Sequence, residues 1–160
     1  MTAILRAISR RGYDADVIYP NTDRGHSGVV AAIRDAQTHS TNGQVRVYPS
    51  LERKVFLRKL LATDLIVGNS SAGIIEAPIA GTPTVNVGPR QEGRLRAGPS
   101  VVDCGESIRA IESAMQRARR LRCAPGRSGC YGTGRAGFRM AQILMQTRLS
   151  DALRRKRITY

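Results

Sequence analysis

The residues best suited to chemistry lie in one stretch, 64–94, at the ends of two short apolar runs. Ser70 and Ser71 directly follow the first run, and Glu76 comes five residues after Ser71. Arg90 follows the second run, after a Gly-Pro pair. In open parallel α/β sheets, ligands bind beyond the carboxyl ends of the strands, beside helix N-termini. The stretch therefore predicts a ligand site at such an edge.

Each of these side chains has a role in binding a nucleotide diphosphate. The hydroxyls of Ser70 and Ser71, with the unbonded N–H groups of a helical first turn, form an anion site that suits phosphate. Glu76 can accept hydrogen bonds from a ribose diol, and the Arg90 guanidinium can fork onto a diphosphate. The alternatives are a serine that only caps a helix, a glutamate that only stabilises a helix N-terminus, and an ordinary surface arginine. Because no Walker loop and no His–Ser or His–Cys dyad is recognisable, the combination favours a nucleotide-diphosphate site over hydride or phosphoryl transfer.

The elements that must position these residues alternate between strand and helix along the whole chain. Helical spacing of apolar residues and short apolar runs predict helices and strands in turn. Helices are expected at 3–11, 28–37, 52–63, 73–80, 106–121 and 135–155, and strands at 15–21, 44–50, 64–69, 82–88 and 100–105. This alternation is typical of a Rossmann-like, doubly wound and mostly parallel sheet. The Gly-rich segment 123–134 is the expected hinge.

The charge of the chain is strongly basic, with 26 Lys and Arg against 12 Asp and Glu and a formal net charge of +14. A nucleic-acid binder is one explanation. The basic residues are spread along the chain, however, and the two densest segments, 117–122 and 153–157, contain no aromatic residue for base stacking. Solvated helix faces and a basic tail are therefore the favoured interpretation, with no nucleic-acid partner.

The cysteine and histidine content gives no metal site. The three cysteines, Cys104, Cys123 and Cys130, form no CxxC pair, and only His26 and His39 could add imidazole ligands. We expect reduced thiols, no metal and no cofactor. At 160 residues with 41% apolar content the chain makes one ordinary domain with a core. It has no run long enough to span a membrane and no signal-like N-terminus, so a cytoplasmic protein is expected.

Four segments together resemble the C-terminal half of the hydrolysing UDP-N-acetylglucosamine 2-epimerases. These segments are VIYPNTDRG, ATDLIVGNSSAGIIEAPIAGTPTVNVGPRQEGR, VVDCGES and YGTGRAGFRMAQIL, and the resemblance runs from Val17 to Leu144. It implies a GT-B fold of two Rossmann-like domains, of which residues 1–144 would form the UDP-binding C-terminal one. Residues 145–160 would then be a basic helical tail. Enzymes acting on related UDP-diacetamido sugars are similar.

The same resemblance implies a set of UDP-binding residues: Ser70, Ser71, Glu76, Arg90, Asn21 and Leu51. By it, the two serines lie at the phosphates, the glutamate holds the ribose and the arginine lines the UDP site. Asn21 lies near the nucleotide-sugar, and Leu51 lies where main chain meets the uracil. The expected ligand is therefore a UDP-sugar.

The family reaction converts UDP-GlcNAc and water to ManNAc and UDP, by elimination of UDP and then hydration, in the synthesis of sialic-type sugars. The family's catalytic acids and a functional histidine match no position of this chain, and His26 and His39 do not fall in their places. We therefore expect this chain to hold UDP but to be inactive alone, with an N-terminal half or a second copy as partner. The alternatives are a stand-alone or split nucleotide-sugar-binding module, the C-terminal half of a GT-B glycosyltransferase, and a basic nucleic-acid binder.

Overall fold

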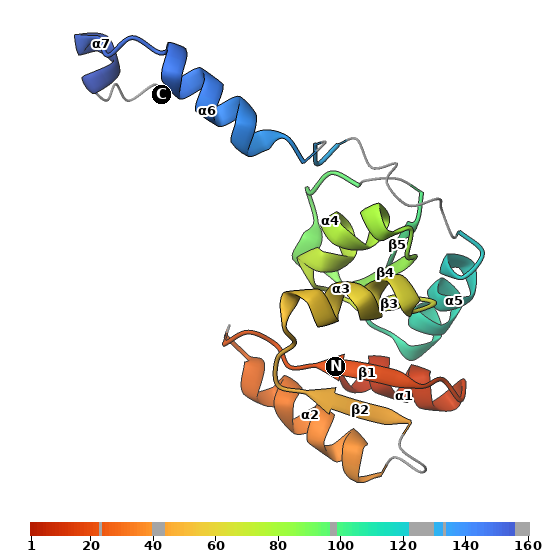
Figure 1. The fold of residues 1–160 in the computed structure, drawn as a ribbon. Helices are drawn as coiled ribbons and strands as arrows, with labels where there is room; N and C mark the ends of the chain where they lie inside the picture. Colours follow the sequence, from red (N-terminus) through yellow and green to blue (C-terminus); the bar gives the residue numbers. More distant parts are fainter. Residues whose placement is uncertain (23, 40–43, 97–98, 122–129, 133, 156–160) are drawn as a thin grey trace. The chain divides into compact units, whose positions relative to one another are not determined.

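The computed structural model describes residues 1–22, 24–39, 44–96, 99–121, 130–132 and 134–155 (Figure 1). Its elements, in chain order, are α1 (Thr2–Arg10), β1 (Ala15–Ile18), α2 (His26–Thr38), β2 (Val45–Tyr48), α3 (Arg53–Ala62), β3 (Ile66–Gly68), α4 (Ser71–Ala80), β4 (Thr84–Val87), the 3-10 turn η1 (Pro89–Gln91), β5 (Val101–Cys104), α5 (Ile108–Ala118), α6 (Ala136–Gln146) and α7 (Asp151–Arg154). The strands all fall within the predicted runs. The chain divides into two compact units, 1–130 and 131–160, which are described separately.

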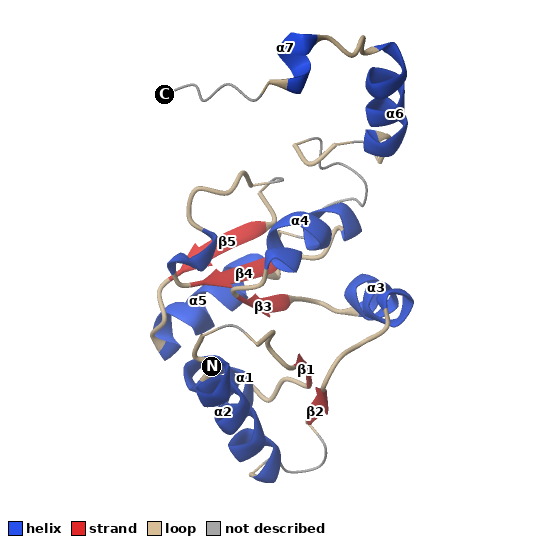
Figure 2. Cartoon of the chain, turned by 90° about the vertical axis from the view of Figure 1, so that its left-hand side faces the viewer, coloured by secondary structure: helices blue, strands red, loops and turns tan. Residues whose placement is uncertain are grey.

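The strands of the first unit form two parallel sheets (Figure 2). One sheet pairs β1 with β2, with Ala15 opposite Val45. The other has the order β3-β4-β5, with Ile66 opposite Thr84 and Thr84 opposite Val101. Every described strand pair is parallel, which confirms the predicted fold class. α2 connects β1 to β2 and α4 connects β3 to β4, whereas only the 3-10 turn η1 is described between β4 and β5. The sheet that the alternation predicts as one is nevertheless in two parts.

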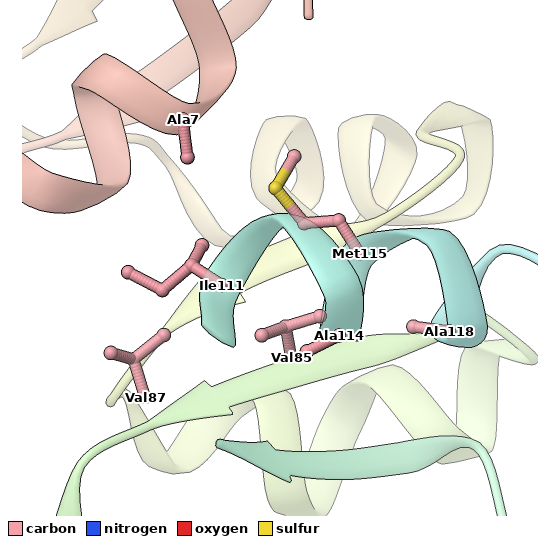
Figure 3. Packing of buried hydrophobic residues seen from close by; sticks show 7 residues of the cluster. All are labelled: Ala7, Val85, Val87, Ile111, Ala114, Met115 and Ala118. Carbon is pink, nitrogen blue, oxygen red and sulfur yellow. The ribbon is translucent and has the colours of Figure 1, made fainter. Parts of the chain in front are cut away.

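The main core lies between the three-stranded sheet and α5 (Figure 3). All four residues of β4 are buried, as expected for the central strand of this sheet. Its alternate side chains Val85 and Val87 pack with Ile111, Ala114 and Met115 on one face of α5, whose apolar positions recur at helical spacing. The carboxyl ends of β3 and β4 are thereby fixed at one edge.

The other face of β4 is held against α4 at close range. The Thr84 hydroxyl donates a hydrogen bond to the main-chain carbonyl of Gly73 at 2.8 Å. The Thr82 hydroxyl, also buried, donates to the Leu60 carbonyl at 2.6 Å and so ties α3 to the same region. Because the residue at 73 has no Cβ, α4 can approach the strand closely enough for the first of these bonds.

Gly73→Ala is expected to lower the free energy of unfolding by about 1–3 kcal/mol, because a Cβ at this position would meet Thr84 Cγ2 at 2.7 Å. Urea denaturation followed by circular dichroism measures the change. Gly28→Ala in α2 is the matched control, since a Cβ there meets nothing within 4 Å and alanine favours the helix. Equal destabilisation by both substitutions would contradict the close approach of α4 to β4.

In the second unit, the prediction of a single helix at 135–155 is wrong. α6 ends at Gln146, Thr147 is extended, and α7 begins after Ser150, whose hydroxyl accepts a hydrogen bond from the Leu153 N–H at 3.3 Å. Ser-Asp at 150–151 is an N-cap signal that restarts the helix. No residue of α6 is buried. The predicted domain boundary at 144 stays a prediction, and much of the predicted hinge at 123–134 lies outside the described residues.

Candidate functional site

The first turn of α4 follows directly from the end of β3. Ser70 is the N-cap, with extended backbone, and its hydroxyl oxygen accepts a hydrogen bond from the Ala72 N–H at 3.3 Å. Ser71 is the first helical residue and is half-buried. Of the two interpretations of Ser70, the cap is therefore observed. The Gly73 N–H is bonded to the Ser70 carbonyl at 3.2 Å. The helix N-terminus at this strand end favours negative charge.

The main-chain carbonyl of Asn69, just before that cap, is the meeting point of two side chains from η1. Arg90 Nη1 donates to the Asn69 oxygen at 3.1 Å, and Gln91 Nε2 donates to it at 2.8 Å. Arg90 is exposed, whereas Gln91 is only 2% exposed. The structure therefore brings Arg90 beside the Ser70–Ser71 turn, as the sequence predicts, with its guanidinium at the surface of the same edge.

The segment that carries Arg90 and Gln91 is tied back to the sheet by Arg96. This arginine donates to both carboxylate oxygens of Asp103 in β5, at 2.8 and 3.1 Å, and to the Gln91 carbonyl at 3.0 Å. Asn86 of β4 also donates to Asp103, at 2.6 Å. Hydrogen bonding by Arg96, against the opposing effect of partial burial, lowers the pKa of Asp103 below its ordinary value. The carboxylate therefore stays ionised and keeps η1 in place at neutral pH.

Glu76 lies one turn and a half into α4 and forms an ion pair with Arg53, the first residue of α3. Its side chain is 23% exposed, so the carboxylate is still reached by solvent. Leu51, which is half-buried, precedes Arg53 by two residues. The structure thus links the predicted ribose residue to the segment that contains the predicted uracil contact, through a side chain that the sequence analysis did not select.

Asn21 is the predicted site residue that the structure leaves apart from the others. It is exposed and lies three residues beyond β1, at the carboxyl end of the two-stranded sheet. Within the described residues, no recorded hydrogen bond joins it to Ser70, Glu76 or Arg90. Its place in the site stays a prediction.

Three further residues of this edge, Arg53, Gln91 and Arg96, were missed from the sequence. Gln91 stands in the segment GPRQEGR, but an isolated glutamine in a loop has no periodic signal of burial. Its Oε1 and the Asn86 Oδ1 are buried with no hydrogen-bond partner in the described part of the chain, so the edge holds two unsatisfied acceptors. The ion pairs of Arg53 and Arg96 depend on tertiary packing, which residue spacing does not show.

A second polar cluster lies on the β1–β2 sheet. Asp16 of β1 accepts from Arg46 Nε at 2.7 Å and from Lys59 Nζ at 2.8 Å. Partial burial acts to raise the pKa of Asp16, but these two cations lower it overall. Among the described residues, no three His, Cys, Asp or Glu side chains are grouped to hold a metal ion, and no helix is long and apolar enough to cross a membrane.

Fold and site together define a class of protein. It is a parallel α/β domain with a capped helix N-terminus and an arginine at the carboxyl ends of its strands, and with a glutamate further along the same helix. The sequence model of the UDP-N-acetylglucosamine 2-epimerase family matches residues 1–145, and the chain belongs to this family. The UDP-N-acetylglucosamine 2-epimerase family predicted from the four sequence segments is thereby confirmed, and its hydrolysing branch stays a prediction.

The relatives are much longer than this chain. A UDP-N-acetylglucosamine 2-epimerase of Neisseria meningitidis serogroup B is 34% identical over 113 residues, which are 71% of this chain and 29% of that protein. A hydrolysing UDP-N,N'-diacetylbacillosamine 2-epimerase of Legionella pneumophila is 34% identical over 125 residues, 78% of this chain and 32% of the relative. The chain thus spans about a third of the length of these curated relatives.

A solved structure supports the fold independently. The crystal structure of the UDP-GlcNAc 2-epimerase from Neisseria meningitidis bound to UDP-GlcNAc superposes with a TM-score of 0.58, covering 91% of this chain and 40% of that one. Its sequence identity is 17%, so this likeness concerns the fold alone.

Proposed function

We propose that this chain binds the UDP part of a UDP-sugar at the carboxyl ends of β3 and β4. The proposal rests on the capped N-terminus of α4 and on Arg90, which donates a hydrogen bond to the carbonyl of Asn69, the residue just before the cap. Helix N–H groups and a guanidinium at one edge of a sheet suit a diphosphate. Glu76, one turn and a half into α4, is the acceptor for the ribose hydroxyls.

The reaction we assign to the complete protein is the hydrolysing 2-epimerisation of UDP-GlcNAc or a related UDP-sugar, as part of sialic-type sugar synthesis. Support comes from the family and from the Legionella relative, whose name specifies a hydrolysing enzyme. In such a reaction, UDP leaves after a proton is removed from the sugar, so the enzyme must hold the leaving group and place a base. Ser70, Ser71 and Arg90 hold the diphosphate in this proposal, and none of the described residues is assigned as the base.

Because the chain covers about a third of its relatives, we expect the 160 residues alone to bind UDP without turning over UDP-GlcNAc. The partner that completes the activity is an N-terminal half of the relatives' kind or a second copy. Release of UDP from UDP-GlcNAc by the purified chain at an enzyme-like rate would contradict this part of the proposal.

Isothermal titration with UDP tests the binding site. UDP is expected to bind and uridine to bind at least about tenfold more weakly, because only UDP offers charge to the helix N-terminus and to Arg90. Glu76→Gln is expected to weaken UDP about tenfold, since it replaces a charged acceptor of the ribose hydroxyls by a neutral one.

Glu112→Gln is the matched control for Glu76→Gln. Glu112 on α5 is also a partly buried glutamate within 4.0 Å of an arginine, but it lies beside α1 and not at the strand ends. This control is expected to bind UDP as the unchanged protein does. Equal loss of affinity in both variants would remove the ribose assignment, and equal affinity for UDP and uridine would remove the diphosphate site.

A further inference from the structure

We propose that the facing edges of β1 and β3 form a strand-pairing site that takes one extended apolar segment from outside these 160 residues. The two parallel sheets of the first unit each end at this position, β2-β1 on one side and β3-β4-β5 on the other. In both views β1, and not β2, is the strand of its sheet that lies toward β3 (Figures 1 and 2). An inserted strand would join the two sheets into one.

On β1, the main-chain groups that point away from β2 belong to Asp16 and Ile18. The Ala15 N–H donates to the Gln44 carbonyl at 2.7 Å, and the Tyr19 N–H donates to the Tyr48 carbonyl at 3.0 Å. Alternate residues of a strand direct their N–H and C=O groups to opposite sides. The groups of 16 and 18 are therefore directed at the edge where the sheet ends.

On β3, the same alternation directs Val67 to the edge. The Ile66 N–H donates to the Pro83 carbonyl on the β4 side at 3.0 Å, so Ile66 and Gly68 face β4. All three residues of β3 are half-buried, whereas all four of β4 are buried. Such a difference in burial is expected between an edge strand and a central strand. The unpaired main-chain groups of an edge strand can pair with another strand.

Helix α1 indicates that the two edges belong to one interrupted layer. Its residues Ala3, Ile4 and Ala7 pack into the core of the three-stranded sheet, whereas Leu5 packs into the core of β1 and α2. Ile8 packs against both cores. One helix, about 10 Å wide, therefore packs into the cores of both sheets. Yet β1 and β3 do not approach each other as neighbouring strands do.

The chemistry of the occupant follows from what surrounds the two edges. On the α1 side, an inserted strand would lie between Val17 of β1 and Val67 of β3, which pack into the two apolar cores. On the opposite side it would lie between Ile18, which is 38% exposed, and Ile66. Asp16 shares this face of β1, and its carboxylate is already paired with Arg46 and Lys59. Apolar residues on both faces are typical of a buried parallel strand. We therefore commit to a short apolar segment, parallel to β1 as every described strand pair of the chain is parallel.

Amide hydrogen exchange of the full ¹⁵N-labelled chain tests the proposal, with a synthetic peptide as the probe. The probe is a lysine-flanked peptide with a six-residue core of valine, isoleucine and alanine. At saturation it is expected to slow exchange of the Asp16, Ile18 and Val67 amides by roughly tenfold. The amides of Ala15 and Tyr19, already bonded within the β1–β2 sheet, are the internal reference.

Two controls separate strand pairing from general adhesion to an apolar surface. The same peptide N-methylated at alternate core residues has lost the donors of one edge and is expected to give no selective slowing. Ile18→Pro removes a donor directed at the site without removing a β1–β2 bond, and is expected to weaken peptide binding at least about fivefold. If that variant does not fold, the N-methylated peptide alone decides.

Three outcomes would overturn the proposal, and the amides become protected in two of them. In one, the unmodified and the N-methylated peptides slow the three amides equally, which would mean contact without main-chain pairing. In the other, the amides become protected without peptide as the protein concentration rises, which would make a second copy of the chain the occupant. Exchange that no concentration of peptide changes would equally remove the site.

Discussion

Arg90→Ala is expected to weaken UDP binding by about 10- to 100-fold, because a charge-assisted hydrogen bond contributes roughly 1.5–3 kcal/mol and each 1.4 kcal/mol is a factor of ten. Two effects combine at this position. The guanidinium that would meet the diphosphate is lost, and the Asn69 carbonyl loses one of the two donors that it has among the described residues, the other being Gln91. Isothermal titration with UDP measures the change.

Arg90→Lys distinguishes the two effects. Lysine retains the positive charge but not the planar fork, so an intermediate loss is expected if the arginine contacts two phosphate oxygens. Arg34→Ala, on the exposed face of α2, is the control for net charge, since it removes the same charge from a helix that packs against β2 of the other sheet. If Arg34→Ala weakened UDP binding as much as Arg90→Ala, the effect would be a general one of a +14 chain.

The strand ends of the site were predictable because they depend on local signals. Short apolar runs that stop at polar or Gly-Pro residues predict strands and their carboxyl ends, and parallel strands place those ends at one edge. Ser70 and Arg90 therefore come together as expected. The pairing of Glu76 with Arg53 was not predictable, because it depends on how α3 packs against α4, and the two residues are far apart in the chain.

Dependence on contacts between distant segments also limits how much of the fold can be predicted from the sequence. Each strand was predictable from its own residues, but the order of strands depends on contacts between distant segments. A run such as ADVI, with Ala15 and Val17 buried and its other two residues exposed, gives no sign of whether it has one neighbour or two. The break between β1 and β3 therefore emerged only from the structure. In the second unit, the error came from a local signal. The Ser150 cap marks the start of a new helix, but the sequence analysis gave more weight to the helical periodicity of 135–155.

The break between the sheets raises the question of whether residues 1–130 unfold as one cooperative unit. The main-chain hydrogen bonds of the two sheets are separate, and α1 connects their apolar cores by contributing Ala7 to one and Leu5 to the other. Helix α3 adds polar contacts to both sides, from Lys59 to Asp16 and from Thr82 to the Leu60 carbonyl. A helix that packs into two cores couples them, since neither core is complete without it. Cooperative unfolding is therefore expected even though the sheet is interrupted.

Ile111→Ala and Ile33→Ala test this coupling and carry the largest expected loss of stability. Both isoleucines are fully buried, one in each core, and an Ile→Ala change in a core costs about 2–5 kcal/mol. Typical domains are stable by only about 5–15 kcal/mol, so either variant should be strongly destabilised. Because α1 links the cores, each substitution is expected to lower one common urea midpoint, whichever core it affects.

Two probes measured in the same titration decide the matter: circular dichroism for the helices, and the exchange-protected amides of β4 and of β1. Coincident transitions that shift together in both variants support coupling through α1. A transition in Ile33→Ala that leaves β4 unchanged would mean that α2, β1 and β2 unfold separately, and that α1 alone does not couple the two cores. Ile143→Ala in α6, where the side chain is 63% exposed, controls for loss of apolar volume and should stay within about 0.5 kcal/mol of the unchanged chain.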